Sequence, residues 1–231
     1  MLYLVSTPIG NLEDITLRAL NTLFGMDSIY CEDTRKTFNL LKNFQKEALT
    51  IPELVSYYEE NELERIPEVI NKLKEGKEIA LVTNAGTPTI SDPGFKLVRE
   101  CVREGIKVFP IPGPSSPIAA LSSSGLPTDK FLFVGFLSPK QGQRLSLLKK
   151  IKESLEALPS TVIFMESPFR IAKTLKDLQE VFGDIEIVIA RELTKIYEEV
   201  KREKVSYFSS LYQTKEPKGE FVVLFNPKAV S

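Results

Sequence analysis

Residues 82–94 decide how this chain is organised; they read Val82-Thr83-Asn84-Ala85-Gly86-Thr87-Pro88-Thr89-Ile90-Ser91-Asp92-Pro93-Gly94. An apolar stretch over 78–83 predicts a buried strand that enters this loop, and a helical pattern begins only at Phe95. Connections of this type usually need only about two to six residues. Open α/β sheets bind ligands at the carboxyl ends of their strands, and glycine lets backbone approach a ligand closely. The loop therefore favours a binding site, with an ordinary connection as the alternative.

Strand and helix patterns alternate on both sides of this loop. Before and after it, the sequence predicts strands over 2–5, 28–31, 54–57, 79–83 and 107–111. Amphipathic helices are expected between them, for example over 15–24, 66–73 and 95–104. Alternation of this kind is typical of a parallel sheet with helices on both faces.

A second α/β domain is expected after the joint Gly125-Leu126-Pro127-Thr128-Asp129. Its predicted strands cover 131–135, 161–165, 186–190 and 221–225, with helices over 144–158 and 170–182 and a mixed region before the last strand. The expected fold class is therefore α/β with two domains, residues 1–124 and 125–231.

Composition removes several classes of chemistry. The 231 residues include no histidine, which excludes Ser-His-Asp and Cys-His catalysis and most zinc sites, so no metal site is expected. Proton transfer must then fall to Asp, Glu, Lys or Tyr, or to solvent. Cys31 and Cys101 lack CxxC spacing and are expected to be buried thiols in a reducing compartment. No apolar run is long enough to cross a membrane, and a cytoplasmic protein is expected.

Polar and turn-forming residues follow most of the predicted strands. The chain has Ser6-Thr7-Pro8-Ile9-Gly10-Asn11 after the first strand, and Pro112-Gly113-Pro114-Ser115 after the strand that ends at Ile111. In the second domain, Glu166-Ser167-Pro168 and Arg191-Glu192-Leu193-Thr194 hold equivalent places. No GxGxxG motif is present, so these loops are not a Rossmann dinucleotide fingerprint, and the absence of a GxxxxGK[ST] motif argues against a nucleoside triphosphatase.

The run Glu32-Asp33-Thr34-Arg35 after the second strand is the best candidate for substrate handling. Asp33 or Thr34 is expected to cap the following helix. The helix dipole disfavours a cation in the first turn, so Arg35 should face an acidic partner or an RNA phosphate. Arg170 invites the same interpretation.

Two basic clusters give a local indication of nucleic-acid binding, although the net charge is only -1. They comprise Lys140, Arg144, Lys149, Lys150 and Lys152, and Lys195, Lys201, Arg202 and Lys204. Solvated helix faces are the alternative interpretation of such runs.

In order along nearly the whole chain, these loops resemble the tetrapyrrole methylase superfamily of S-adenosylmethionine-dependent enzymes. The closer resemblance is to the ribosomal RNA small-subunit methyltransferase I group, which methylates a cytidine ribose 2′-oxygen in 16S rRNA. It rests on residues 6–16, 32–35, 85–94, 112–115, 124–129, 166–168, 190–195 and 218–220. The chain departs from the group at Asn84, where Asp is usual, and at Phe169, where His is common.

The resemblance implies an S-adenosylmethionine-dependent methyltransferase, usually a homodimer, with its cofactor in a cleft between two α/β domains. The partner it implies is 16S rRNA or the 30S ribosomal subunit. The cofactor-binding residues implied by matching positions are Pro8, Ala85, Gly86, Thr87, Ile90, Ser115, Ser116, Glu166 and Leu193.

A ribose hydroxyl is a poor nucleophile, so a carboxylate is expected to accept its proton. The candidates are Glu32, Asp33, Glu166 and Glu192, with Glu32 or Glu166 preferred and Arg35 expected to assist at the substrate. Two alternatives remain open: a methyltransferase of the same fold that acts on a small tetrapyrrole-like substrate, and a non-catalytic binding module.

Overall fold

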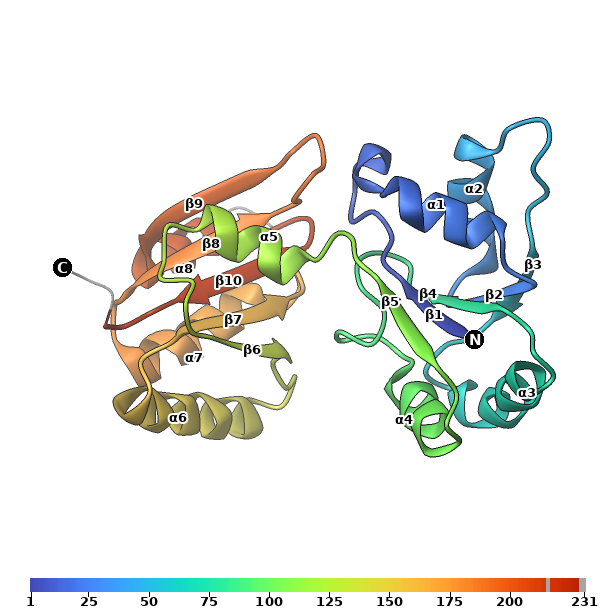
Figure 1. The fold of residues 1–231 in the computed structure, drawn as a ribbon. Helices are drawn as coiled ribbons and strands as arrows, with labels where there is room; N and C mark the ends of the chain where they lie inside the picture. Colours follow the sequence, from blue (N-terminus) through green and yellow to red (C-terminus); the bar gives the residue numbers. More distant parts are fainter. Residues whose placement is uncertain (215–216, 229–231) are drawn as a thin grey trace. The chain divides into compact units, whose positions relative to one another are not determined.

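The computed structural model describes residues 1–214 and 217–228 and divides the chain into two compact units, Met1–Ser115 and Ser116–Ser231. Each unit holds one five-stranded sheet with helices on both faces (Figure 1). In the described ranges, no helix combines the length and the apolar character needed to cross a bilayer.

The sheet of the first unit is entirely parallel, with the strand order β3-β2-β4-β1-β5. Its strands are β1 (Leu2–Val5), β2 (Ser28–Cys31), β3 (Glu53–Ser56), β4 (Ile79–Val82) and β5 (Val108–Ile111). Every residue of the inner strands β2 and β4 is buried, as expected for strands covered on both faces. The predicted alternation of strands and helices is confirmed in this unit.

Helices cover both faces of this sheet (Figure 1). A short 3₁₀ turn, η1 (Leu12–Asp14), precedes α1 (Leu17–Phe24), which packs with α2 (Thr34–Phe44) on one face. On the other face, α3 (Glu62–Lys74) packs with α4 (Phe95–Arg103). After β2 the chain therefore continues along one face of the sheet, through α2, and after β4 it continues along the opposite face, through α4. Because β2 and β4 are neighbours, their carboxyl ends form the switch point at which open α/β sheets bind ligands.

The second sheet is mixed and has the order β6-β7-β10-β8-β9. Its strands are β6 (Phe131–Phe136), β7 (Thr161–Glu166), β8 (Glu186–Arg191), β9 (Glu199–Lys204) and β10 (Phe221–Phe225). Only β6 and β7 pair in parallel, and β10 is antiparallel to both β7 and β8. The carboxyl ends of β7 and β8 therefore lie at the same edge of this sheet.

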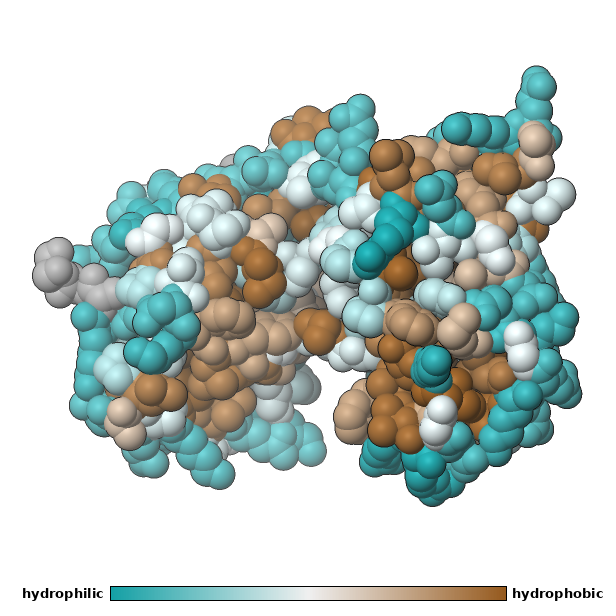
Figure 2. Space-filling view, viewed as in Figure 1, coloured by the Kyte–Doolittle hydropathy of each residue, from teal (hydrophilic) through white to brown (hydrophobic). Residues whose placement is uncertain are grey.

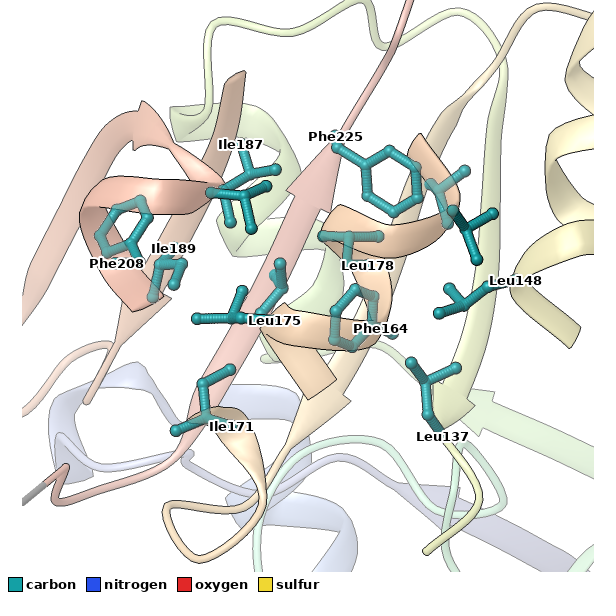
Figure 3. Packing of buried hydrophobic residues seen from close by; sticks show 14 of the residues in the cluster. Leu137, Leu148, Phe164, Ile171, Leu175, Leu178, Ile187, Ile189, Phe208 and Phe225 are labelled. Carbon is teal, nitrogen blue, oxygen red and sulfur yellow. The ribbon is translucent and has the colours of Figure 1, made fainter. Parts of the chain in front are cut away.

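Successive side chains of the strands in the second sheet point to opposite faces, so that a separate hydrophobic core forms on each face. Leu224 and Val222 face α5 (Ser116–Ser123), whereas Val223 and Phe225 face the opposite layer. That layer consists of α6 (Gln141–Ala157), α7 (Ile171–Phe182) and α8 (Val205–Thr214). Figure 3 shows the aliphatic and aromatic side chains of this larger core interdigitating around Phe164. Side chains of this kind each stabilise the fold by about 1.5–3 kcal/mol when fully buried.

Two parts of the second unit differ from the sequence-based expectation. The mixed region resolves into β9 and α8, and β9 was missed because its sequence Glu-Val-Lys-Arg-Glu-Lys is as polar as a solvated helix. Such a strand is possible because it lies at the sheet edge, where charged side chains discourage further pairing. The first unit ends at Ser115, before the expected joint at Gly125, because α5 packs on β7 and β10.

Candidate functional site

Hydrogen bonds join the loops that follow β1, β4 and β5 into one edge of the first sheet. Thr7 and Gly86 exchange two backbone hydrogen bonds of 2.9 and 3.0 Å. The Thr87 hydroxyl donates to the carbonyl of Pro114 at 3.1 Å and lies 3.0 Å from the hydroxyl of Ser6. Since a hydroxyl has one proton, Ser6 is the donor in that last pair. Three segments far apart in the sequence thus form one surface, as the strand-end pattern predicts.

The backbone of this edge is unusual. Among the described residues, all non-glycine positions with positive φ lie in the loops after β4 and β8: Thr89 (74°), Ser91 (63°), Glu192 (51°) and Thr194 (65°). Such conformations cost about 1–3 kcal/mol each and concentrate at ligand sites and active sites. Both loops contain residues that the family resemblance implies for cofactor binding, namely within residues 85–90 after β4 and at Leu193 after β8.

Two glycines make the close packing of these loops possible. Gly94 has φ +120°, and a Cβ there would lie 2.5 Å from Cδ2 of Leu81. A Cβ on Gly113 would lie 2.9 Å from Cβ of Ser6. Any side chain at either position would force the edge apart, which explains the glycines in both loops.

The edge also presents backbone donors that suit a polar ligand. Ala85 is exposed, and within residues 1–214 and 217–228 neither its N–H nor the N–H of Thr87 makes a hydrogen bond. Ile90 is 44% exposed, and Pro8 is buried beside the Thr7–Gly86 bridge. Free donors beside apolar side chains suit a ligand with both a carboxylate and an aromatic ring. The residues present therefore fit the cofactor that the sequence implies.

A hydrogen-bonded group of polar residues lies at the switch point between β2 and β4. The carboxylate of Glu32 accepts from the Thr83 hydroxyl at 3.0 Å and from the Asn84 N–H at 2.9 Å, both through Oε2. Burial, and then the charge of Glu32, raise the pKa of Asp92 to about 6. The Asn84 contact uses only the backbone, so the change from Asp at this position leaves it intact.

Asp33 and Arg35 pair with each other. Asp33 caps α2 by accepting from the Arg35 N–H at 2.9 Å, so the predicted cap is confirmed. Two further bonds, of 3.1 and 2.9 Å, join Nε and Nη2 of Arg35 to the same carboxylate. The Arg35 guanidinium lowers the pKa of Asp33 to about 2. The acidic partner expected for Arg35 is therefore its neighbour, and the Arg35 side chain stays 87% exposed.

Glu166, expected at the substrate or the cofactor, lies inside the second unit with no exposed side-chain surface. Oε1 accepts from the Ser167 N–H at 2.8 Å and from Arg170 at 2.7 Å, and Oε2 accepts from the Thr174 hydroxyl at 2.7 Å. Arg170 also donates to the carbonyl of Leu137 at 2.9 Å. Through these contacts, the charged side chains of Glu166 and Arg170 stabilise the start of α7.

Ser115 lies at the end of the first unit, and Ser116 begins α5, where its hydroxyl is 3.9 Å from Sδ of Met165. Leu193 follows β8 and packs against the smaller core of the second unit. Beside it, the Glu192 carboxylate accepts from Lys195 and from the Glu220 N–H, each at 3.0 Å. The predicted residues of the second unit thus lie at the carboxyl edge of β7 and β8 or beside it.

A buried carboxylate that the sequence did not single out anchors the far end of the β4 loop. Oε1 of Glu62 accepts from the Tyr57 hydroxyl at 3.0 Å and from the Gly94 N–H at 2.9 Å, and Oε2 pairs with Lys96 at 2.9 Å. Burial opposes ionisation, but Lys96 and the two hydrogen bonds outweigh it and lower the pKa of Glu62. Tyr57 is buried, whereas Tyr58 is 41% exposed. The one signal for Glu62 in the sequence is its place in the first turn of a helix.

The structure corrects part of the prediction about the basic clusters. Arg144 is buried and pairs with Asp177 at 2.5 Å, so it contributes to the core and not to a charged surface. Lys140, Lys149 and Lys150 are exposed. Cys31 and Cys101 are buried free thiols, as expected. No group of acidic or cysteine side chains suited to a metal ion occurs in the described part of the chain.

With this geometry in place, the comparisons with known proteins are decisive about the family. The sequence model of the tetrapyrrole (corrin/porphyrin) methylases matches residues 1–208. The chain belongs to this family. It is 48% identical to the ribosomal RNA small subunit methyltransferase I of Thermotoga maritima, over 98% of both chains. Its identity to the enzyme of that name from Escherichia coli O157:H7 is 45%, over 96% of this chain and 76% of that one.

Solved structures agree with a tetrapyrrole methylase fold. Cobalt precorrin-4 methyltransferase, a cobalamin biosynthetic enzyme, matches 96% of this chain and 93% of its own at a TM-score of 0.67 and 18% identity. Uroporphyrin-III-C-methyltransferase from Thermus thermophilus covers the same shares at a TM-score of 0.64 and 21% identity. At such low identity these likenesses establish the fold alone.

Proposed function

We propose that this tetrapyrrole methylase transfers a methyl group from S-adenosylmethionine to the 2′-hydroxyl of a cytidine ribose in 16S rRNA. The observation that carries the proposal is the 48% identity, over 98% of both chains, to a ribosomal RNA small subunit methyltransferase I. Its second support is the hydrogen-bonded edge formed by the loops after β1, β4 and β5.

The donor site that we propose comprises Pro8, Ala85, Gly86, Thr87 and Ile90, with Ser115 at the end of the first unit. The free N–H groups of Ala85 and Thr87 would donate to polar atoms of the donor, and Ile90 would cover an apolar part of it. When bound, S-adenosylmethionine supplies a methyl group on a positively charged sulfur. Ser116 and Leu193 stay predicted contacts, whereas the Glu166 side chain, which has no exposed surface, is not expected to touch the donor.

For the acceptor, we propose that Glu32 takes the proton of the hydroxyl. It is partly exposed at the switch point, whereas the described contacts enclose Glu166 on every side. General bases of this kind contribute about 10²–10⁴-fold to the rate. The Asp33–Arg35 pair lies next to Glu32 in sequence, and its exposed guanidinium is available to an RNA phosphate.

The test is to incubate the purified protein with labelled methyl donor and 30S particles that lack the modification, and then to map the label. We expect label on one cytidine ribose. Transfer to an added tetrapyrrole precursor, with unlabelled RNA, would support the small-molecule alternative. Donor binding without transfer to either would support a non-catalytic module.

The positive charge of the basic residues on the exposed face of α6 and on β9 supports RNA as the substrate. If phosphate contacts dominate the affinity, the binding constant should fall steeply with salt, since each contact releases condensed counterions. Lys149→Ala and Lys150→Ala should reduce the salt slope, and Arg144→Ala should act through folding instead, because Arg144 is buried.

We also propose a homodimer. Hydrophobic atoms gather over α5 and the edge strand β6 (Figure 2), where Ile118, Phe131, Leu132 and Phe136 are 37–53% exposed. An exposed apolar edge strand is a site for association with another chain. Sedimentation equilibrium of the wild type and of Phe136→Lys would test this: we expect a dimer that the substitution weakens. A monomeric wild type would contradict it.

A further inference from the structure

The charged side chains of helix α2 are all basic. The segment between its cap at Asp33 and Glu47 holds four basic residues and no acidic one; these are Arg35, Lys36, Lys42 and Lys46. All four are exposed. Arg35 pairs with the cap, but none of the three lysines forms an ion pair within residues 1–214 and 217–228. Lys42 donates to the neutral amide oxygen of Gln45 at 3.1 Å.

The helices on the other face of the same sheet carry acidic partners for their basic residues. On α3, Glu68 pairs with Arg65 at 2.8 Å and with Lys72 at 3.1 Å. On α4, Glu100 pairs with Arg103 at 2.6 Å. Mixed charges of this kind are usual for a helix face that only keeps a protein in solution. The positive charge of α2 has no such partner, so that face attracts an anionic one.

Four exposed side chains of α2 form one stripe along the helix. They are Arg35, Phe38, Asn39 and Lys42, at positions i, i+3, i+4 and i+7. Thr37 and Leu41, on the other side of the helix, are buried. Phe38 is apolar and yet 46% exposed. The stripe begins within one turn of Glu32, the proposed proton acceptor, and its two cations are about 10 Å apart along the axis.

Resting on the function proposed above, we propose that this stripe binds an unpaired segment of the substrate RNA beside the nucleotide that is methylated. Arg35 and Lys42 contact two phosphates, and a base stacks on the ring of Phe38 between them. The Asn39 amide hydrogen-bonds the polar edge of that base. A protein partner would need several apolar side chains on this face, whereas one aromatic ring between two cations matches the alternation of phosphates and bases in an unpaired strand.

The test is filter binding of 30S particles that lack the modification to the wild type, Lys42→Ala and Phe38→Ala at several salt concentrations. Lys42→Ala should reduce the slope of log K against log salt by about 0.7, the value for one phosphate contact to a single strand. Phe38→Ala should lower the affinity by about fivefold or more with an unchanged slope, because stacking releases no counterions. Phe38→Tyr, which keeps a ring, should bind like the wild type.

Arg103→Ala is the matched control for loss of one charge. The Arg103 side chain is 73% exposed and lies at the end of α4, on the opposite face of the same sheet, so affinity and slope should stay unchanged. Wild-type affinity and slope in both Lys42→Ala and Phe38→Ala would overturn the inference and leave the proposed function intact. If Phe38→Ala does not fold, Phe38→Leu takes its place. Failure of the proposed function has a different signature, namely no RNA methylation by the wild type.

Replacement of Phe38 by the photoreactive p-benzoylphenylalanine identifies the class of partner. With the same 30S particles, we expect a cross-link to 16S rRNA. A cross-link to a ribosomal protein instead would overturn the inference, because the stripe would then be a protein-docking surface.

Discussion

Glu32 and Glu166 occupy equivalent places in the sequence, each at the carboxyl end of a strand and each before a helix. Their surroundings differ. Glu166 has no exposed surface, and both of its oxygens accept hydrogen bonds from within the second unit. Glu32 uses one oxygen for the β4 loop and stays partly exposed. A carboxylate at a strand end is therefore not by itself a sign of catalysis; the number of donors around it separates a structural carboxylate from a reactive one.

Glu166→Gln should show the largest effect on stability. The change leaves Arg170 without its buried partner, and breaking a buried pair costs about 3–5 kcal/mol. Urea unfolding of the variant beside the wild type measures this, with Glu32→Gln as the matched strand-end control. We expect Glu32→Gln to lose methyl transfer with little change in stability, and Glu166→Gln to do the reverse. Equal stability of the two variants would remove the distinction.

Gly94→Ala should come next. Its φ of +120° disfavours a side chain, and the new Cβ would lie 2.5 Å from Leu81. We expect a loss of about 2–4 kcal/mol in the free energy of unfolding. Gly76 is the control, because it has φ +91° but nothing within 4 Å of the added atom. Gly76→Ala should lower the free energy of unfolding by about 1–2 kcal/mol. A similar loss at both positions would mean that the β4 loop accommodates the added Cβ by a small shift.

Asp92→Asn should stabilise the protein at neutral pH. The folded state raises the pKa of Asp92 from 3.8 to about 6, so folding favours the protonated acid. Stability from this group is full below the unfolded pKa and is lost as the pH rises through the folded one. The variant should therefore gain about 1–3 kcal/mol at pH 7.5 and nothing near pH 3.5. Thermal unfolding at both pH values measures the gain; an equal effect at both would contradict the assigned shift.

Arg35→Ala should have the smallest effect on stability. The side chain is 87% exposed, and exposed ion pairs contribute about 0–1 kcal/mol. If Arg35 contacts an RNA phosphate, the variant should bind 30S particles less tightly and with a smaller salt slope. Filter binding at several salt concentrations tests this, and an unchanged slope would assign Arg35 to the cap of α2 alone.

The fold was largely predictable because the first sheet follows simple rules. Strands β2 and β10 have the bounds that the sequence predicts, since each is a short apolar run between turn signals. Strand β9 was not predictable, because its pairing at the sheet edge depends on β8 and not on its own polar sequence. The placement of α5 in the second unit likewise depends on distant strands.

For the candidate site, sequence patterns predict which loops share one edge of the sheet but not the contacts within those loops. The link between Thr7 and Gly86 follows from parallel strands whose carboxyl ends share one edge, which patterns can predict. The anchoring of Gly94 by Glu62 depends on how a long loop folds back. No local pattern encodes that path, because the residues are ordinary turn and helix-start residues.

The central claim is that the edge formed by the loops after β1, β4 and β5 holds the methyl donor. The most direct measurement is a calorimetric titration of S-adenosylmethionine into the wild type, Ala85→Trp and the control Ala48→Trp, since both alanines are exposed. We expect the wild type and Ala48→Trp to bind alike, and Ala85→Trp to bind at least about tenfold more weakly, a loss of about 1.4 kcal/mol. Equal affinity of all three proteins would contradict the claim.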